Sequence, residues 1–342
     1  MSTTTVQPSA PTPVSAARSN PLARALRTVG VQNISLIAAI VVLVLVIGSQ
    51  NSAFYLGSNL KTIGMAVTIS GLLSVVQTVV IIMGGIDLTV GSVAGLASVT
   101  SAMVFTHTNA GVSILATLVV GALAGVINAC IVVFGRVTPM IATLAGLTAY
   151  KGVAQLVSDG RAQGYTGADS TFIFLARGSV LGIPTLVWVL VVVAVLVHVM
   201  LKYTRAGRNI YAVGGNDTAA RLSGININRH IFSVFMLAGV VAAIAGVLIT
   251  ARTGSGQPVS GSEGLELQSV TAAALGGVAL RGGKGSVGGT ILAVILLGVL
   301  LNGMSLLGVN PFWQNVAQGA LLAGAVILQQ VRSGERRVGL PK

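Results

Sequence analysis

Long apolar runs separated by short polar stretches dominate this chain. A run of about 20 apolar residues lets a helix cross a bilayer core of about 30 Å, because each helical residue rises about 1.5 Å. The runs are continuous and do not alternate with polar residues, which excludes the pattern of a membrane β-barrel. The pattern therefore predicts an all-α, polytopic membrane protein. We expect about ten transmembrane helices, at residues 34–48, 62–83, 91–105, 112–134, 139–157, 184–201, 230–251, 267–280, 287–307 and 311–331.

Two of these predicted segments, 91–105 and 267–280, are short and rich in glycine. Either could be a broken or re-entrant helix, which a membrane tolerates only where protein encloses the exposed backbone. These two segments are therefore the places where a complete span is least expected.

The longest polar interruption, residues 202–229, predicts the face on which a soluble partner binds. Basic loops between apolar spans mark the cytoplasmic side. The stretches 158–182 and 253–264 then face outside and could receive an external partner, although flexible connection is the simpler interpretation. The charged residues of 202–229 are Lys202, Arg205, Arg208, Arg221, Arg229 and a single acid, Asp217.

The distribution of basic residues supports this orientation. With the N-terminus inside, the ten spans return the C-terminus to the same side, and most basic residues then fall in the cytoplasm, as the positive-inside rule requires. The inner residues are Arg18, Arg24, Arg27, Arg136, Lys202, Arg205, Arg208, Arg221, Arg229, Arg281, Lys284, Arg332, Arg336, Arg337 and Lys342. The outer residues are Lys61, Arg161, Arg177 and Arg252.

Composition agrees with a membrane protein and argues against nucleic acid as a partner. Hydrophobic residues make up 54% of the 342 residues and charged ones 8%, against about 25% charged in soluble domains. A net charge of +13 would suit a nucleic-acid surface, but aromatic residues are only 4% and no basic patch is interleaved with them. The positive charge is explained by membrane topology.

The two ends of the chain differ from the apolar middle. Residues 1–30 begin with a stretch rich in Ser, Thr, Pro and Ala, which predicts a disordered cytoplasmic tail. The first apolar run starts too late for a cleaved signal peptide, so it is expected to remain as the first span. We expect one membrane domain at 31–331 and a cytoplasmic C-terminal tail at 332–342.

Two internal similarities predict an inverted repeat. Gly84-Gly85-Ile86-Asp87-Leu88 resembles Gly276-Gly277-Val278-Ala279-Leu280. The junction with Asn128, Gly135 and Pro139 matches the later junction with Asn302, Gly308 and Pro311. An offset of five spans reverses the direction of each helix, which is the plan of many transporters.

The sequence shows no constellation that would make this chain an enzyme. None of its acids sits in the middle of a predicted span, so no carboxylate pair, Ser-His-Asp set or metal cluster is visible. The absence of a carboxylate from the middle of any predicted span also argues against a proton-coupled carrier. Cys130 is the only cysteine, and we expect no cofactor and no metal. The acids are Asp87, Asp217 and Glu335 on the inner side, Asp159, Asp169 and Glu263 on the outer side, and Glu266 beside 267–280.

One glycine-rich stretch resembles a nucleotide-binding motif without its context. Residues 283–288 match G-x-G-x-x-G, but no strand precedes them. They are not a P-loop either, because Gly285 follows Lys284 where Ser or Thr is needed. We interpret 283–288 as a tight cytoplasmic turn, and we expect any ATP hydrolysis to occur on another chain.

Several polar and small residues within the spans allow two interpretations. Amide side chains could line a path for a hydroxyl-rich solute, or could form hydrogen bonds that lock helix packing. Lys151 is expected to extend toward the outer interface, and a contact with the solute is the alternative. Pairs of glycines four residues apart should let helices approach closely. The path candidates are Gln77, Asn128, Asn302 and Gln314, with Asn315 and Gln318 as further amides, and the glycine pairs are Gly91 with Gly95, Gly121 with Gly125, and Gly285 with Gly289.

Taken together, several motifs resemble the permease subunits of bacterial ATP-binding-cassette importers for ribose, xylose and related monosaccharides. The resemblance covers roughly residues 33–331, and Thr89 stands where that family frequently has Ser. The signature residues are Gly84, Gly85, Asp87, Gly91 and Ser92. The other matching segments are 139–144, 212–225, 274–277, 282–285, 302–303 and 307–309.

The resemblance implies a function and a set of partners. It implies a permease of the bacterial cytoplasmic membrane that moves a monosaccharide-like solute, together with a second permease copy or paralogue, cytoplasmic ATPase subunits and an extracytoplasmic solute-binding protein. A secondary transporter or a channel remains the alternative. A short helix from Asp217 to Ser223, capped by Asn216, is expected in the coupling segment. The residues that the resemblance places at the ATPase contact are Gly214, Gly215, Asn216, Ala219, Ala220 and Gly224.

Overall fold

The computed structural model describes residues 31–333, so the expected tail at 1–30 and residues 334–342 of the expected tail at 332–342 lie outside the described residues. Within the described part the fold is helical, apart from one two-stranded hairpin. The long helices are α2 (Val31–Gln50), α3 (Gly57–Ile82), α4 (Val90–His107), α5 (Ala110–Val133), α6 (Pro139–Ser158), α8 (Thr185–Tyr203), α11 (Ile227–Thr253), α13 (Val287–Leu306) and α14 (Pro311–Ser333). The short elements are η1 (Ser52–Tyr55), α7 (Ser170–Arg177), β1 (Ser179–Val180), β2 (Ile183–Pro184), α9 (Arg205–Gly215), α10 (Asp217–Leu222) and α12 (Leu265–Leu275).

Eight of the described helices are long and apolar enough to cross a membrane, namely α2 to α6, α8, α11 and α13. The prediction of an all-α, polytopic membrane protein is therefore confirmed. A count of ten complete spans is not confirmed, because α12 has only 11 residues and α14, although 23 residues long, has too many polar positions to be among the eight.

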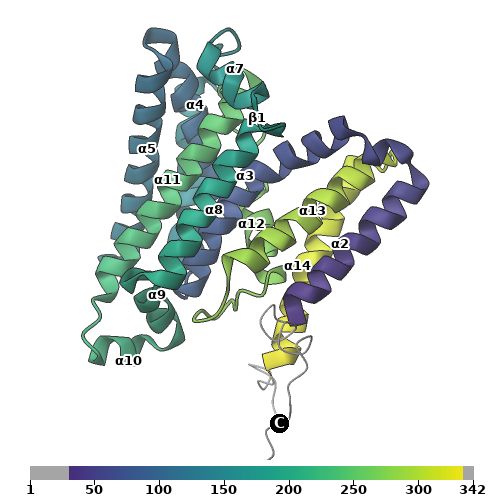
Figure 1. The fold of residues 1–342 in the computed structure, drawn as a ribbon. Coiled ribbons are helices and arrows are strands. Elements are labelled where there is room, and N and C mark those ends of the chain that lie inside the picture. The colour runs from purple at the N-terminus through teal and green to yellow at the C-terminus, as the bar shows by residue number, and fades with distance from the viewer. Residues whose placement is uncertain (1–30, 334–342) are drawn as a thin grey trace, which may run out of the picture.

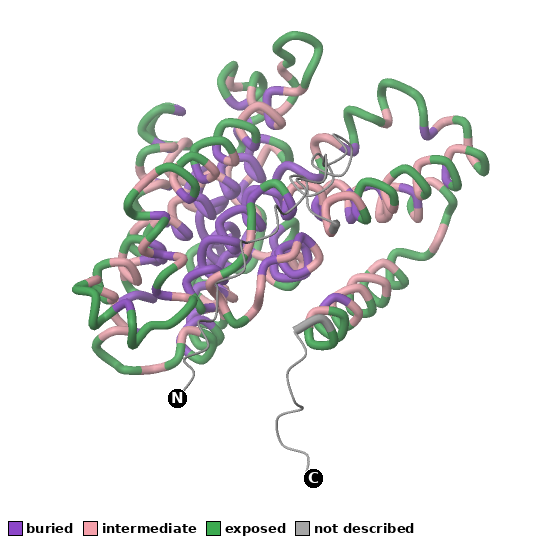
Figure 2. Tube along the Cα trace, turned by 60° about the horizontal axis from the view of Figure 1, so that its bottom comes forward, coloured by how far each residue is buried: buried purple, intermediate pink, exposed green. Residues whose placement is uncertain are grey.

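Helix α3 joins two groups of helices (Figure 1). Helices α8 and α11 pack on α3, and α4 and α5 pack on α11. On the other side α2, α13 and α14 form a separate arm, in which α13 packs on α3. Burial is heaviest along the C-terminal half of α3, where residues 67–82 are all buried. Figure 2 shows this buried centre and the more exposed arm. The arm is expected to need further partners, because an apolar surface exposed on a helix favours lipid or protein contact.

Small residues bring the helices close together, as the glycine pairs predicted. A Cβ atom on Gly121 or Gly125 would overlap the backbone of α11 at Gly239 or Phe235. In the same way, Gly289 lies against the carbonyl oxygen of Gly276. These contacts allow backbone-to-backbone packing between helices that have no solvent-driven force to hold them in lipid.

At 267–280, one of the two segments where a complete span was least expected, the helix is too short to cross a membrane. Helix α12 ends at Leu275, and the segment that precedes it, residues 255–264, is not a free outer connection. The amide of Gln257 donates to the hydroxyl of Ser98 in α4 at 3.0 Å, and Pro258 packs against Gly95. This span is therefore discontinuous, with an extended half beside α4 followed by a half-helix.

The residue types explain why this span is discontinuous. Gly261 and Gly264 adopt positive φ angles of 85° and 78°, which break a helix and which glycine adopts without strain. The backbone of Gly256 exchanges two hydrogen bonds with Gln163, which satisfies polar groups that a lipid environment would leave unpaired. The other glycine-rich segment, predicted at 91–105, is not interrupted. It forms α4, a helix of 18 residues that is long enough to span a membrane.

The inner ends of α3 and α12 have the same geometry. The amide of Gly84 bonds to the carbonyl three residues before it, and the amide of the next residue bonds to the carbonyl five residues before it. Gly277 and Val278 repeat this pattern, and Gly84 and Gly277 have φ angles of 98° and 87°. The equivalent of Gly84 is thus Gly277, one residue later than the sequence comparison suggested. The inverted repeat itself stays a prediction.

Candidate functional site

The basic interruption at 202–229 is folded rather than irregular. It contains α9 and α10, and each begins at a side-chain cap. The hydroxyl of Thr204 accepts from the amide of Gly207 at 3.1 Å, and Oδ1 of Asn216 accepts from the amide of Ala219 at 2.9 Å. The predicted helix after Asn216 and its cap are therefore confirmed, and α10 ends at Leu222.

Helix α9 is attached to the membrane bundle by one apolar face. Its buried residues Ile210 and Val213 lie three positions apart, as a face packed on a neighbouring element requires. The hydroxyl of Tyr211 donates to the carbonyl oxygen of Gly285 at 2.8 Å. Burial raises the pKa of Tyr211 above its usual value, so the hydroxyl stays protonated and remains a donor.

Three chain segments meet where α9 ends. Gly214 lies against the carbonyl oxygen of Ile82 at the end of α3 and against the amide of Gly283 in the loop that enters α13. That same amide donates to the Ile82 carbonyl at 2.8 Å, and Gly282 packs on Gly84. We name this contact the glycine junction, formed by Gly84, Gly214, Gly282 and Gly283. Since glycine has no side chain, the backbone of α9 contacts the two other backbones directly at this junction.

The predicted coupling residues divide into two groups. Gly215, Asn216, Ala219 and Gly224 are exposed, whereas Gly214 is half-buried in the glycine junction and Ala220 is buried. Leu222, at the end of α10, is 85% exposed.

The family signature at the start of α4 builds a buried polar network. Asp87 accepts hydrogen bonds from both the amide and the hydroxyl of Thr89. Nδ2 of Asn128 donates to that same hydroxyl at 2.8 Å, and the hydroxyl of Tyr150 donates to Oδ1 of Asn128 at 3.0 Å. In the orientation that satisfies its amide, Gln77 bonds to both backbone groups of Asp87. The network thus ties α3, α4, α5 and α6 together.

The four amide candidates for a solute path each have a protein partner. Gln77 and Asn128 are buried in the network just described. Asn302 exchanges hydrogen bonds with Asn59 at 3.0 and 3.2 Å. Gln314 donates to the hydroxyl of Ser305 at 2.9 Å. Of the two interpretations left open by the sequence, helix packing accounts for these contacts.

A charged pair lies where the sequence predicted none. Nζ of Lys151 in α6 lies 3.0 Å from Oε1 of Glu263, just before α12. The ion pair with Glu263 was not predicted, and the outward extension of Lys151 and the outer placement of Glu263 stay predictions. Ser92 and Glu266 line a small cavity beside the pair.

Glu263 also lines a second, larger cavity. This cavity has a volume of about 400 Å³ and lies between α12 and α14. Thr271, Asn315 and Gln318 supply hydroxyl and amide groups, and leucines supply apolar surface. Lys151 stands twelve residues beyond Pro139, so at about 1.5 Å per residue the pair lies about 18 Å into α6.

The sequence contained a signal for this cavity that helix prediction alone did not use. Lys151 was the one basic residue inside a predicted span, and a charge in a membrane span usually has a function and a partner. Its partner could not be identified, because Glu263 lies far along the chain in a stretch assigned to a loop. Among residues 31–333, no three His, Cys, Asp or Glu side chains come together to hold a metal ion.

Comparison with known proteins identifies the relatives of this chain. Residues 59–326 match the family described as the branched-chain amino acid transport system/permease component. The chain is 38% identical to the ribose import permease protein of Escherichia coli over 293 residues, covering 85% of this chain and 91% of the relative. It is 36% identical to the Bacillus subtilis ribose import permease over 85% and 91% of the two chains. It is 34% identical to the L-arabinose transport system permease protein of E. coli over 82% and 84%. No solved structure matches.

Proposed function

The chain belongs to this family of transport-system permease components, and on that premise we propose that it is the membrane-spanning subunit of an ATP-binding-cassette importer for a monosaccharide-like solute. The observation that carries the proposal is similarity, over more than four fifths of the chain, to permeases named for ribose and L-arabinose. A multi-pass helical protein suits such a role.

Three protein partners follow from the proposal. Cytoplasmic ATPase subunits bind the exposed edge of α9 and α10, where Gly215, Ala219 and Leu222 lie. A solute-binding protein delivers the solute on the opposite side. A second permease copy or a paralogue packs against the exposed helices, so that the solute path is closed toward lipid.

The cavity between α12 and α14 suits a polyhydroxylated solute. The carboxylate of Glu263 accepts hydrogen bonds from hydroxyl groups, whereas the amides of Asn315 and Gln318 both donate and accept them. Leu267 and Leu322 offer apolar surface to the C–H face of a sugar ring. Ligand sites combine apolar walls with a few placed polar groups in this way.

The half-helix α12 connects the two functional regions. Its start lies beside Glu263 and its end leads into the loop that carries Gly282 and Gly283 of the glycine junction. Closure of the ATPase subunits moves α9, and the glycine junction passes this movement to α3 and to the α12–α13 loop. Because partner binding favours one conformation over the other, it shifts the population between outward-open and inward-open states.

The test is a double substitution on the exposed edge of the coupling segment. Gly215→Glu with Ala219→Glu places bulky charges at two positions where the native residues are exposed. The variant is made in the cells that produce the protein, so that all partners are present, and uptake of labelled monosaccharides is measured. We expect uptake to be lost while membrane insertion is retained. Normal uptake in this variant would contradict the proposal.

The second candidate function, a secondary transporter or a channel, makes the opposite prediction. It requires the purified chain in liposomes to move the solute along an imposed ion gradient without any ATPase. Such movement would favour the alternative, whereas its absence together with ATP-dependent uptake in cells supports the importer.

A further inference from the structure

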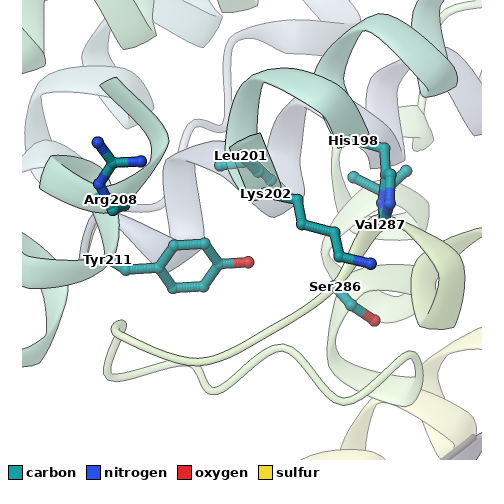
Figure 3. A pocket seen from close by; sticks show the side chains of 7 residues that line it. All are labelled: His198, Leu201, Lys202, Arg208, Tyr211, Ser286 and Val287. Carbon is teal, nitrogen blue, oxygen red and sulfur yellow. The ribbon is translucent and has the colours of Figure 1, made fainter. Parts of the chain in front are cut away.

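A second cavity of about 500 Å³ lies at the inner end of α8, far from Glu263. Figure 3 shows the side chains that line it. Helix α8 contributes His198 and Lys202, α9 contributes Arg208 and Tyr211, and the start of α13 contributes Ser286. In this view the ring of Tyr211 lies between Arg208 at one end and Lys202 at the other.

Positive charge in this cavity has no internal compensation. Among residues 31–333, neither Lys202 nor Arg208 forms an ion pair, and no acid lines the cavity. The Nζ atom of Lys202 lies 5.3 Å from the centre of the ring of Tyr203. Two cations that share a concave site without a carboxylate favour an anionic ligand.

The backbone adds donors to the same site. Helix α13 is 20 residues long and begins at Val287, whose first amides have no acceptor within the helix. Ser286 caps the amide of Gly289 at 3.2 Å, and Ser286 and Val287 both line the cavity. The partial positive charge of a helix N-terminus adds to the attraction for a phosphate.

The position of the cavity indicates where the anion comes from. Val195, Val199 and Lys202 fall on one face of α8, at spacings of four and three residues, and both valines are exposed. Tyr203, 64% exposed, stands at the end of the helix, as aromatic residues do at the membrane interface. An apolar strip that ends in a basic pocket matches an acyl chain that ends in a phosphate.

We propose that this cavity binds the phosphate group of an anionic phospholipid of the inner leaflet, with Lys202, Arg208 and the first amides of α13 as its ligands. The bound lipid lies between α8, α9 and the loop that enters α13, next to Tyr211 and its bond to Gly285. It therefore holds the segment that leads to the glycine junction. Soluble phosphate offers the same chemistry and is distinguished by the experiment.

The experiment measures retained lipid on the purified, full-length chain. The protein is reconstituted in nanodiscs of equal parts phosphatidylglycerol and phosphatidylcholine, and the lipids that remain bound after detergent extraction are counted by native mass spectrometry. The test variant is Lys202→Gln with Arg208→Gln. The matched control is Arg161→Gln with Arg252→Gln, which removes two exposed basic residues far from this cavity. Lys202→Arg keeps the charge and controls for folding.

We expect the wild type, the control and Lys202→Arg to retain phosphatidylglycerol, and the test variant to retain it about tenfold less. If inorganic phosphate displaces the lipid, the site recognises phosphate from either source. Equal retention by the test variant and the wild type overturns the proposal. It is also overturned if the test variant loses ATPase binding in lipid-free detergent with lipid retention unchanged, because the cavity would then be a protein contact.

Discussion

Nζ of Lys151 lies 3.0 Å from Oε1 of Glu263, although 112 residues separate them in the chain. The pair links α6 to the start of α12 and borders the polar cavity between α12 and α14. Both side chains are partly exposed, at 38% and 68%. A pair this exposed adds little to stability, about 1 kcal/mol or less. Its effect is therefore expected on transport.

Neutralising either member of this pair should reduce uptake with little loss of stability. Glu263→Gln removes an acceptor from the proposed solute cavity and leaves Lys151 unpaired. We expect uptake to fall about tenfold, since a lost charged hydrogen bond corresponds to about 1.5 kcal/mol or more, while the midpoint of thermal unfolding in detergent stays nearly unchanged. The exchange Lys151→Glu with Glu263→Lys should recover part of the uptake, and Arg252→Gln serves as an exposed control. A large drop in the unfolding midpoint would show that the pair is structural instead.

The packing at the glycine junction predicts that alanine substitutions at two adjacent glycines have very different effects on stability. A Cβ on Gly214 would overlap the carbonyl oxygen of Ile82 and the amide of Gly283, whereas a Cβ on Gly215 meets nothing within 4 Å. Gly214→Ala should destabilise the protein by about 1–3 kcal/mol, because overpacking forces the backbones apart. Gly215→Ala should leave stability within about 0.5 kcal/mol. Both are measured by thermal unfolding in the same detergent, and equal midpoints for the two variants would contradict this packing.

The hydrogen bonds of the Thr89 hydroxyl predict that two conservative substitutions at this position differ in their effect on stability. It donates to Asp87 and accepts from Asn128, so Thr89→Val leaves a buried carboxylate and a buried amide each short of one partner. We expect a loss of about 1–3 kcal/mol. Thr89→Ser keeps the hydroxyl and should cost much less. The two variants are compared by their unfolding midpoints, and a stable Thr89→Val protein would mean that the network is not needed.

Leu222 tests where the ATPase subunits bind. It is 85% exposed at the end of α10, and Leu181, 87% exposed in the β1–β2 turn, provides a matched control. Leu222→Glu should weaken association with the ATPase subunits and reduce ATP-driven uptake, because it places a charge in an apolar contact. Leu181→Glu should leave that association unchanged. Co-purification of the ATPase subunits with each variant is the measurement, and equal yields would place the contact elsewhere.

The local parts of the fold were predictable because short-range physics determines them. The apolar runs predicted most of the long helices, and Asn216 predicted the cap and the start of α10. The glycine pairs predicted close packing, since they have no side chain to separate two backbones. Helix signals of this kind depend on neighbours a few residues away, which the sequence displays directly.

The long-range parts were not predictable in the same way. Residues 255–264 have the composition of a flexible loop, yet Ser98 and Gly95 of α4 fix them within the bundle. For the same reason Lys151 was left without a partner. Such contacts depend on which helix lies beside which, and one sequence gives no direct information on that arrangement.

The sequence by itself determined that the chain is a helical membrane protein, where its long basic interruption lies and which family motifs it carries. These follow from hydropathy, charge and local residue patterns. Only the tertiary structure decided that α12 is a half-helix, that Lys151 pairs with Glu263 and that Gly214 joins three segments. The reason is that an unpaired polar group in lipid costs several kcal/mol, about as much as a lost hydrogen bond in an apolar medium. The group that pairs with it can lie far away along the chain, so the sequence does not show which group it is.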